Sequence, residues 1–267
     1  MTAPLNRPIR VVQFSGRYLD PPALKFALLL DAHPEIDLVG VLCEAAGSGW
    51  RFRLGELWRR RGLLGLSVLM RDLSNAAIHF LRGPAEAVSL RAKAKRLAAK
   101  IATVPDMHAA EVLERVRIWR PDLGAIYGAP VLRPALFEIP ALGTFGIHHG
   151  RVPHYRGKKT TFWEIYNGEP TAGVTIQRVD SGIDTGDVVK SGEVTIGAKS
   201  YGRVERETQE LGFELYLESI LEASRGCARF SRQVATPRGR HYRQPSFADF
   251  IKLWVRVAGR RLGLRST

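Results

Sequence analysis

The sequence contains few cysteines and no long apolar segment. Cys43 and Cys227 are its only cysteines, and two thiols exclude a disulfide framework or a thiolate zinc site. The apolar stretch Leu63–Met70 has eight residues, and no apolar run approaches the roughly 20 residues that span a bilayer. Residues 1–8 contain no apolar segment of the kind found in secretory signals. These absences predict a cytoplasmic protein.

Acidic residues are also scarce. The 267 residues include 26 Asp or Glu against 40 Lys or Arg, which gives a formal net charge of +14. Such an excess favours anionic partners: phosphorylated substrates, nucleic acid or an acidic membrane face. The charge is uneven, because residues 225–267 carry eleven Arg or Lys against one acid, Asp249, and residues 49–120 carry fifteen against six. The stretch 121–224 is close to neutral.

Apolar segments alternate in a pattern typical of α/β proteins. A strand is predicted over Ile9–Phe14, a helix over Pro21–Ala32 and a second strand over Ile36–Leu42. This order predicts a mostly parallel sheet with helices on both faces. Only Gly16 follows the first strand, so no dinucleotide-binding G-x-G-x-x-G is present. Further strands are predicted over 123–127, 144–148, 173–179 and 188–194, and further helices over 109–119, 159–167 and 201–222.

Two segments combine Trp, Leu and Phe with many arginines. One lies within residues 49–100 and the other spans 247–265. Both patterns indicate basic amphipathic helices. Two interpretations are open: a helical insertion packed on the sheet with solvated arginines, or a surface that contacts anionic lipid. Stacking of bases on the aromatic residues is a third, weaker alternative.

Two motifs carry candidate chemistry. The first is G-I-H-H-G-R-V-P-H-Y-R-G at 146–157, and the second is G-V-T-I-Q-R-V-D-S-G-I-D-T-G-D at 173–187. They place the His148 imidazole and the Asp184 carboxylate where strands pass into loops, a workable pair for acyl transfer to an amine. The alternatives are a core histidine at 148 and a solvated turn around Asp184. A calcium loop is excluded because the D-x-D-x-D-G spacing is absent.

A metal site is the less favoured interpretation of the same residues. His149 and His154 lie close to His148 in the sequence. Adjacent residues of a strand point to opposite faces, so His148 and His149 are not expected to bind one ion. We therefore predict no metal.

The motifs resemble those of the folate-dependent formyltransferases. In that family a strand ends in N-x-H, an S-L-L-P-x-x-R-G loop follows, and a later D-x-G supplies a catalytic carboxylate. The string R-P-D-L-G-A-I-Y-G-A-P-V-L at 120–132 also resembles the family, and the resemblance covers roughly 9–45 and 103–215. It implies a Rossmann-like formyltransferase fold over 1–224, with a helical basic insertion at about 49–100, followed by a basic amphipathic C-terminal extension over 225–267.

The resemblance also implies roles for individual residues. His148 would stabilise the oxyanion, and Asp184 would keep His148 charged and relay a proton through water. The expected contacts with 10-formyltetrahydrofolate are Tyr127, Gly128, Val131, Pro153, Asp180, Gly182 and Ile183. The expected contacts with the amine substrate are His149, Arg156, Thr161 and Trp163. From the residues alone, Arg156 is either an anion clamp or part of a structural salt bridge, and Trp163 either lines a pocket or belongs to the core.

Gly146 departs from the family pattern at a catalytic position. It stands where the family has Asn, whose amide donates to the formyl oxygen. Three outcomes are open. His148 and a backbone N–H act alone; another side chain (Thr160, Thr161 or His149) takes the place of the amide; or the chain has kept the fold and lost the transfer.

The expected function is transfer of a formyl group from 10-formyltetrahydrofolate to a primary amine of a nucleotide-linked or lipid-linked amino sugar. About fifty residues follow the long predicted helix, without alternating strands, which argues against a tRNA substrate. The alternatives are hydrolysis of the same donor, a methionyl-tRNA formyltransferase-like activity, or a catalytically silent ligand-binding homologue. Peripheral contact with the inner face of an anionic membrane is a further expectation, and nucleic acid is not an expected partner.

Overall fold

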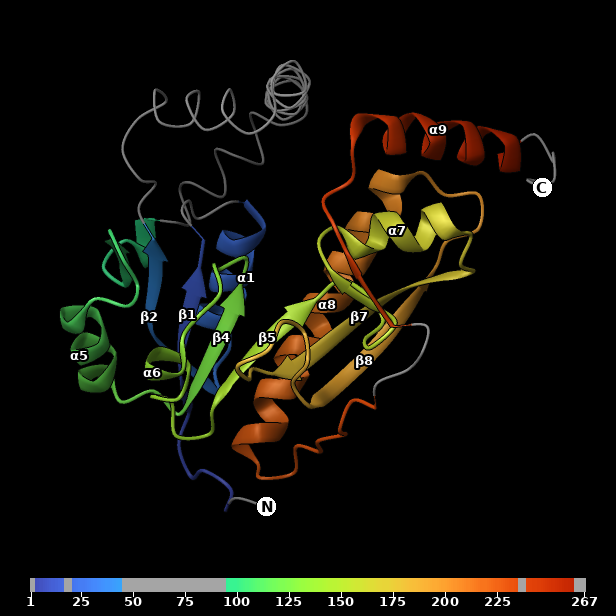
Figure 1. Ribbon diagram of the computed structural model, residues 1–267. Coiled ribbons are helices and arrows are strands. Elements are labelled where there is room, and N and C mark those ends of the chain that lie inside the picture. Colours follow the sequence, from blue (N-terminus) through green and yellow to red (C-terminus); the bar gives the residue numbers. More distant parts are fainter. Residues whose placement is uncertain (1–2, 17–20, 45–94, 235–238, 262–267) are drawn as a thin grey trace.

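The computed structural model describes residues 3–16, 21–44, 95–234 and 239–261. Most of the predicted insertion at 49–100 therefore lies outside the described residues. The main sheet has seven strands in the order β3-β2-β1-β4-β5-β7-β8 (Figure 1). The strands are β1 (Ile9–Ser15), β2 (Ile36–Glu44), β3 (Ile101–Val104), β4 (Leu123–Tyr127), β5 (Thr144–His148), β7 (Thr171–Arg178) and β8 (Val188–Thr195). β1 to β5 run parallel, and β7 and β8 are antiparallel additions at one edge.

Helices cover both faces of this sheet, as predicted. The described part of the chain includes α1 (Pro21–Ala32), α5 (Ala110–Trp119), α6 (Pro134–Phe137), α7 (Thr160–Asn167) and α8 (Tyr201–Ser224), and a further helix, α9 (Phe247–Arg261), packs on α7. α1 begins at two prolines, whose fixed φ suits a first helical turn. α7 ends at Gly168, which adopts φ +83 in the left-handed region that glycine tolerates. The mostly parallel α/β fold inferred from the sequence is thus confirmed.

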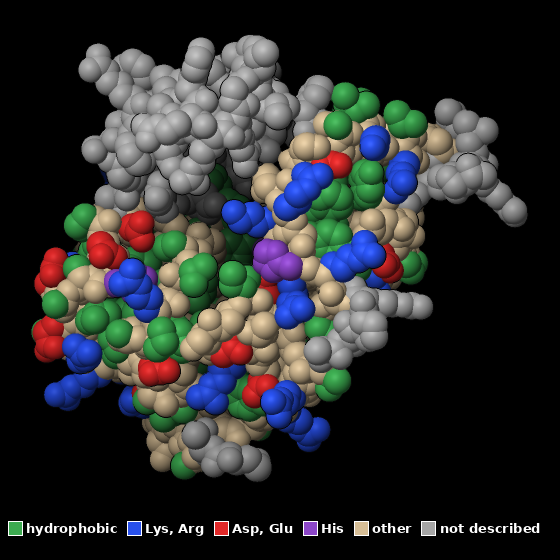
Figure 2. Space-filling model, in the orientation of Figure 1, with side chains coloured by type: hydrophobic (Ala, Val, Ile, Leu, Met, Phe, Trp, Pro, Cys, Tyr) green, Lys and Arg blue, Asp and Glu red, His purple; other side chains and the backbone are tan. Residues whose placement is uncertain are grey.

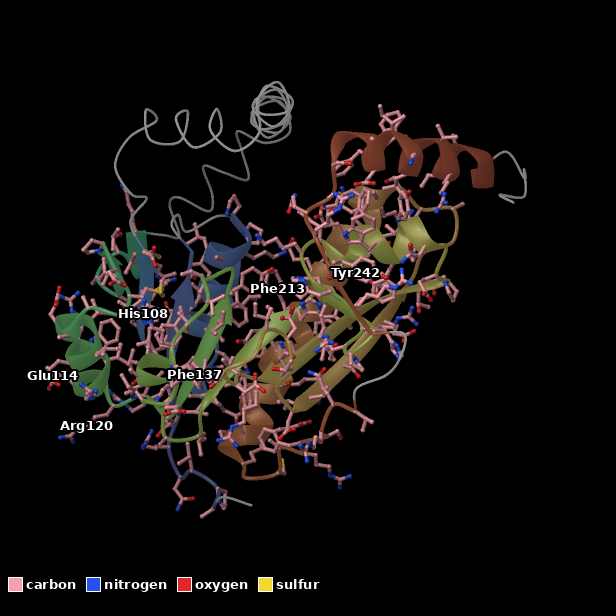
Figure 3. All side chains as sticks on the ribbon, viewed as in Figure 1. His108, Glu114, Arg120, Phe137, Phe213 and Tyr242 are labelled. Carbon is pink, nitrogen blue, oxygen red and sulfur yellow. The ribbon has the colours of Figure 1, made fainter. Side chains whose placement is uncertain are left out.

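Two apolar cores lie on opposite faces of the sheet. One contains α1 and α8 residues, among them Phe26, Phe213 and Tyr216, packed on Phe145 and Ile176 of the strands. The other contains Phe14 of β1 together with residues of α5 and α6, such as Val116 and Phe137. Figure 3 labels Phe213 and Phe137, which mark these two layers. Phe145 and Ile176 therefore define the α8 face, and their strand neighbours project to the other face.

A small second sheet joins the C-terminal part of the chain to the loop after β5. β6 (Tyr155–Gly157) pairs in parallel with β9 (Arg240–Tyr242). Above them, α9 packs on α7, with Phe250 4.6 Å from Phe162 between ring centroids and Leu253 buried in the same cluster. The sequence did not predict either short strand. Their pairing places residues 240–242 directly beside the first motif.

The carboxyl ends of the parallel strands lie together at the same end of the sheet, as expected for this topology. β4 ends at Tyr127 and β5 at His148, so both predicted loops start there. Figure 1 shows α7 and α9 on the same side of the molecule as the tips of these strands, with the N-terminus at the opposite end. Among the described residues, no helix is long and apolar enough to cross a membrane.

Candidate active site

His148 is held between two acceptors. It is the last residue of β5 and is only 6% exposed. Its Nδ1 lies 3.3 Å from Oδ1 of Asp184, and its Nε2 lies 2.7 Å from the backbone oxygen of Tyr155. A carboxylate and a carbonyl only accept hydrogen bonds, so both ring nitrogens must donate. The geometry therefore suits the doubly protonated, cationic imidazolium.

Asp184 occupies the turn after β7 and adopts φ +54. Its Oδ2 accepts a hydrogen bond from the Gly157 N–H at 2.9 Å, and its Oδ1 accepts one from Nε2 of Gln177 at 3.2 Å. Burial alone raises the pKa of Asp184, but the contacts with His148, Gly157 and Gln177 outweigh it, so this pKa lies below its ordinary value. The carboxylate is thus ionised at neutral pH and would stabilise a positive charge on the His148 ring beside it.

The loop between the two residues is anchored by a buried acid. Glu164 of α7 is fully buried and accepts hydrogen bonds from the backbone N–H groups of Arg151 and Gly173. Burial raises the pKa of Glu164 to about 7, although those donors and the Arg151 guanidinium lower it. Arg151 also lies 2.5 Å from Glu169, whose other oxygen accepts the Tyr155 hydroxyl proton at 2.7 Å. This network positions the Tyr155 carbonyl that holds His148.

None of the three side chains suggested as a replacement amide for Gly146 is available. The hydroxyls of Thr160 and Thr161 both donate to the backbone oxygen of His149. The His149 ring lies on the α8 face, 6.4 Å from the Tyr127 ring, so it points away from His148. Burial, followed by the charge of His148, lowers the pKa of His149 to about 4. In this structure none of the three side chains is directed to the position at which the family Asn would meet a formyl oxygen.

The carboxamide that does lie beside Gly146 belongs to Gln177. β5 and β7 are antiparallel, with Gly146 directly opposite Gln177 and His148 directly opposite Thr175. Opposed residues of such a pair project to the same face. Gln177 is therefore on the face of His148 and is 8% exposed. Sequence reasoning missed it because the pairing register, which places it here, cannot be read from the motif.

The predicted folate contacts fall into two groups. Gly128 and Gly182 lie on exposed backbone in the loops after β4 and β7, and Val131 and Ile183 on the same loops are 72% and 53% exposed. The other three contacts are Tyr127, Asp180 and Pro153. The Tyr127 ring is buried under α1 and α8. The Oδ1 atom of Asp180 accepts the Gly182 N–H at 3.0 Å and shapes the second loop, and Pro153 follows a cis peptide bond in the loop after β5. Tyr127 is thus a core residue rather than an exposed ring.

The predicted substrate contacts also divide. Among the described residues, Arg156 has no ion-pair partner, and its Nε is buried without a hydrogen bond. That arrangement argues against the structural salt bridge and leaves the guanidinium for a ligand. Trp163, in contrast, is 8% exposed and packs on Tyr242, with its indole N–H bonded to the Arg243 carbonyl. Trp163 is therefore a core residue and does not line an open pocket.

One face of the molecule is hollowed and bordered by basic side chains. Figure 2 shows a recess near the middle of this face, with hydrophobic side chains in it and Lys and Arg side chains at its rim. In the described part of the chain, no three His, Cys, Asp or Glu side chains gather in a way that could hold a metal ion. His148 and His149 point to opposite faces, as the strand geometry predicts.

Comparison with known proteins identifies the fold. The phosphoribosylglycinamide formyltransferase of Streptococcus pneumoniae TIGR4 aligns with a TM-score of 0.53 at 18% identity, over 80% of this chain and 97% of that one. A sugar N-formyltransferase of a Shewanella species gives 0.53 at 15% identity, over 92% and 86%. At these identities the likeness shows the fold alone. The chain therefore has the fold seen in formyltransferases.

The sequence comparisons identify the family. The profile of the family described as formyl transferase matches residues 83–220, so the chain belongs to the formyl transferase family. Methionyl-tRNA formyltransferases of Citrifermentans bemidjiense and Chloroflexus aggregans are 35% and 37% identical to it over 118 and 119 residues. Each alignment covers 43% of this chain, and it spans only 37% and 38% of the length of these relatives.

Proposed function

We propose that this protein transfers a formyl group from 10-formyltetrahydrofolate to the primary amine of an anionic small molecule, an amino sugar linked to a nucleotide or lipid. The observation that carries the proposal is the clamped His148–Asp184 pair at the end of β5, 3.3 Å apart. The exposed apolar side chains of Val131 and Ile183 fit a flat aromatic donor on the loops beside it.

The proposed reaction assigns three roles to His148 and Asp184. The amine nitrogen attacks the formyl carbon, a new C–N bond forms, and the carbonyl electron pair moves onto oxygen. The positive charge of His148 stabilises that oxygen. When the electron pair returns, the bond from carbon to the donor nitrogen breaks. The proton lost by the amine passes through water beside Asp184 to the departing nitrogen. Asp184 maintains the charge of His148 throughout.

The anionic character of the acceptor is proposed from Arg156. This guanidinium lies next to Gly157, whose N–H binds Asp184, and it has no acidic partner among the described residues. A guanidinium can bind a phosphate through two parallel hydrogen bonds. His241 is paired with Arg156 across the β6–β9 ladder, and Arg240 precedes it on the same segment. Arg243 of that segment already forms an ion pair with Asp249 at 3.0 Å. A phosphorylated acceptor complements the charge of Arg156 and Arg240.

The test is turnover of 10-formyltetrahydrofolate, followed by absorbance, with a panel of amino-sugar nucleotides and with methionyl-tRNA. Transferase activity predicts donor consumption that requires an amine and is lost in His148→Ala and Asp184→Ala. His33→Ala, at the far end of α1, is the matched control. Consumption without any amine identifies a hydrolase. Absence of turnover, with folate binding retained, identifies a silent homologue and overturns the proposal.

We further propose that α9 rests on an anionic membrane at the cytoplasmic face. Its inner side is buried on α7, but Ile251, Trp254 and Val255 are 51%, 79% and 68% exposed on the outer side. These positions, spaced by three and four residues, form one apolar face, with Lys252 exposed beside it. Sedimentation with vesicles of phosphatidylglycerol, compared with phosphatidylcholine, tests this. Trp254→Ala should weaken binding to the acidic vesicles severalfold, whereas equal binding to both lipids contradicts the proposal.

A further inference from the structure

The His148 imidazole has no N–H left to bind a developing oxyanion in this structure. Nδ1 faces Asp184 and Nε2 is bonded to the Tyr155 carbonyl. His148 can stabilise the oxyanion by its charge, but a direct hydrogen bond requires either loss of the Tyr155 contact or another donor. An oxyanion in a tetrahedral intermediate generally needs a donor about 2.7–3.1 Å away. The question is therefore which group on this face supplies that N–H.

Gln177 has a free amide proton at this position. Its Nε2 donates one N–H to Asp184 at 3.2 Å, and its Oε1 accepts the Gln233 amide at 3.1 Å. These two contacts fix which end of the carboxamide faces Asp184, because only the nitrogen can donate to a carboxylate. A primary amide has two N–H groups. In the part of the chain that the structure describes, the second one has no acceptor.

The space into which this N–H can reach is the one left by Gly146. Gly146 lies opposite Gln177 in the ladder and two residues before His148, on the same face. A Cβ built at Gly146 would meet only Val179, at 3.4 Å. The absence of a side chain there leaves room for a small group between Gln177 and His148. A formyl oxygen in that space would lie beside both the amide and the imidazolium.

We propose that Gln177 is a catalytic residue that donates its second amide N–H to the formyl oxygen as negative charge develops on it. The inference rests on the proposed formyl transfer and adds the donor that Gly146 cannot provide. No proton leaves Gln177 in this step. The new C–N bond and the oxyanion form while the amide N–H stays intact, and the hydrogen bond is strongest at the transition state.

The first test replaces the amide with a side chain of similar size. Gln177→Met removes both N–H groups while it keeps the volume of the site. We expect kcat to fall by about 10²–10³, the usual effect of deleting one oxyanion donor, with little change in KM for the formyl donor. Glu210→Gln, on the exposed side of α8, is the neutral control. Thermal unfolding of Gln177→Met reports whether the fold is retained, and Gln177→Leu serves if it is not.

The second test restores an amide from the opposite strand. Gly146→Asn places a carboxamide in the open space, so Gly146→Asn with Gln177→Met should regain at least tenfold of the lost kcat. If Gln177 only positions Asp184, Gln177→Met should shift the pH profile of kcat, and Gly146→Asn should not restore the lost activity. Unchanged activity in Gln177→Met, or a loss that Gly146→Asn does not restore, overturns the inference. A wild-type protein without any donor turnover overturns both this inference and the proposed function.

Discussion

The backbone N–H of Gly157 donates a 2.9 Å hydrogen bond to Oδ2 of Asp184. This contact joins the loop after β5 to the loop after β7 at the proposed catalytic carboxylate. Gly157 adopts φ +98, and a Cβ there would come 2.4 Å from the backbone oxygen of Tyr242. The position therefore requires glycine for both its conformation and its close contact with β9.

Replacement of Gly157 by alanine should separate β6 from β9 and weaken the contact with Asp184. We expect a loss of about 1–3 kcal/mol in the free energy of unfolding, together with reduced formyl transfer. Urea denaturation and initial rates measure the two effects. Gly197→Ala is the control, because Gly197 also has positive φ (+50) but nothing within 4 Å of its added Cβ. An equal effect of both substitutions would show that strain alone, and not the contact with Tyr242, is responsible.

Replacement of Asp184 by asparagine tests charge separately from shape. Asparagine retains an acceptor for Gly157 but cannot stabilise a cationic His148. We expect formyl transfer to fall by about 10²–10⁴, the range over which general acid–base groups act. Asp187→Asn, in the same turn, is the matched control and should retain near-normal rates. If both variants lose activity equally, the turn matters for its structure and not for the carboxylate at 184.

The raised pKa of Glu164 should make the stability of the protein depend on pH. Its pKa is raised from 4.5 to about 7 in the folded protein, so between these values the folded state binds a proton that the unfolded state has lost. The free energy of unfolding should therefore fall as pH rises from about 4.5 to about 7, by at most about 3 kcal/mol. Denaturation of wild type and Glu164→Gln at several pH values checks this. Parallel profiles for the two proteins would contradict it.

Arg156 should affect substrate binding more than the chemical step. Arg156→Lys keeps the charge and loses the planar pair of donors, whereas Arg156→Ala loses both. We expect KM for a phosphorylated acceptor to rise severalfold in Arg156→Lys and by about tenfold or more in Arg156→Ala. Arg117→Ala on α5 removes an equal charge far from the site. An unchanged KM in both Arg156 variants would contradict the proposal that the acceptor is anionic.

Most of the fold could be predicted because its long elements carry clear patterns. The strand and helix boundaries around Ile36, Leu123 and Tyr201 follow from apolar runs that end at glycine, proline or polar turns. β3, β6, β9 and α6 are only three or four residues long, too short to show a period. β6 and β9 in particular exist because two distant segments meet.

The candidate site could be predicted in part for the same reason. His148 lies at the end of one predicted strand and Asp184 in the loop that follows another, and loops at the same end of a sheet come together. Gln177 could not be found, because a polar residue inside a strand gives no sign of which residue it will face. For Trp163 the sequence left a pocket and a core position open, and it could not decide between them because the residues that cover Trp163, including Tyr242 and Arg243, lie in the C-terminal segment.

The pairing of β9 with β6 also affects the order in which the parts of the site form while the protein is being synthesised. Ribosomes synthesise His148, Arg156, Gln177 and Asp184 well before residues 240–242. Until those three residues have left the ribosomal tunnel, Tyr155–Gly157 lacks its partner strand, and the N–H that holds Asp184 is not fixed. In a growing polypeptide the sheet can close around its core while the reactive loop is still open. Residues 240–242 thus complete the site after its reactive side chains have been made.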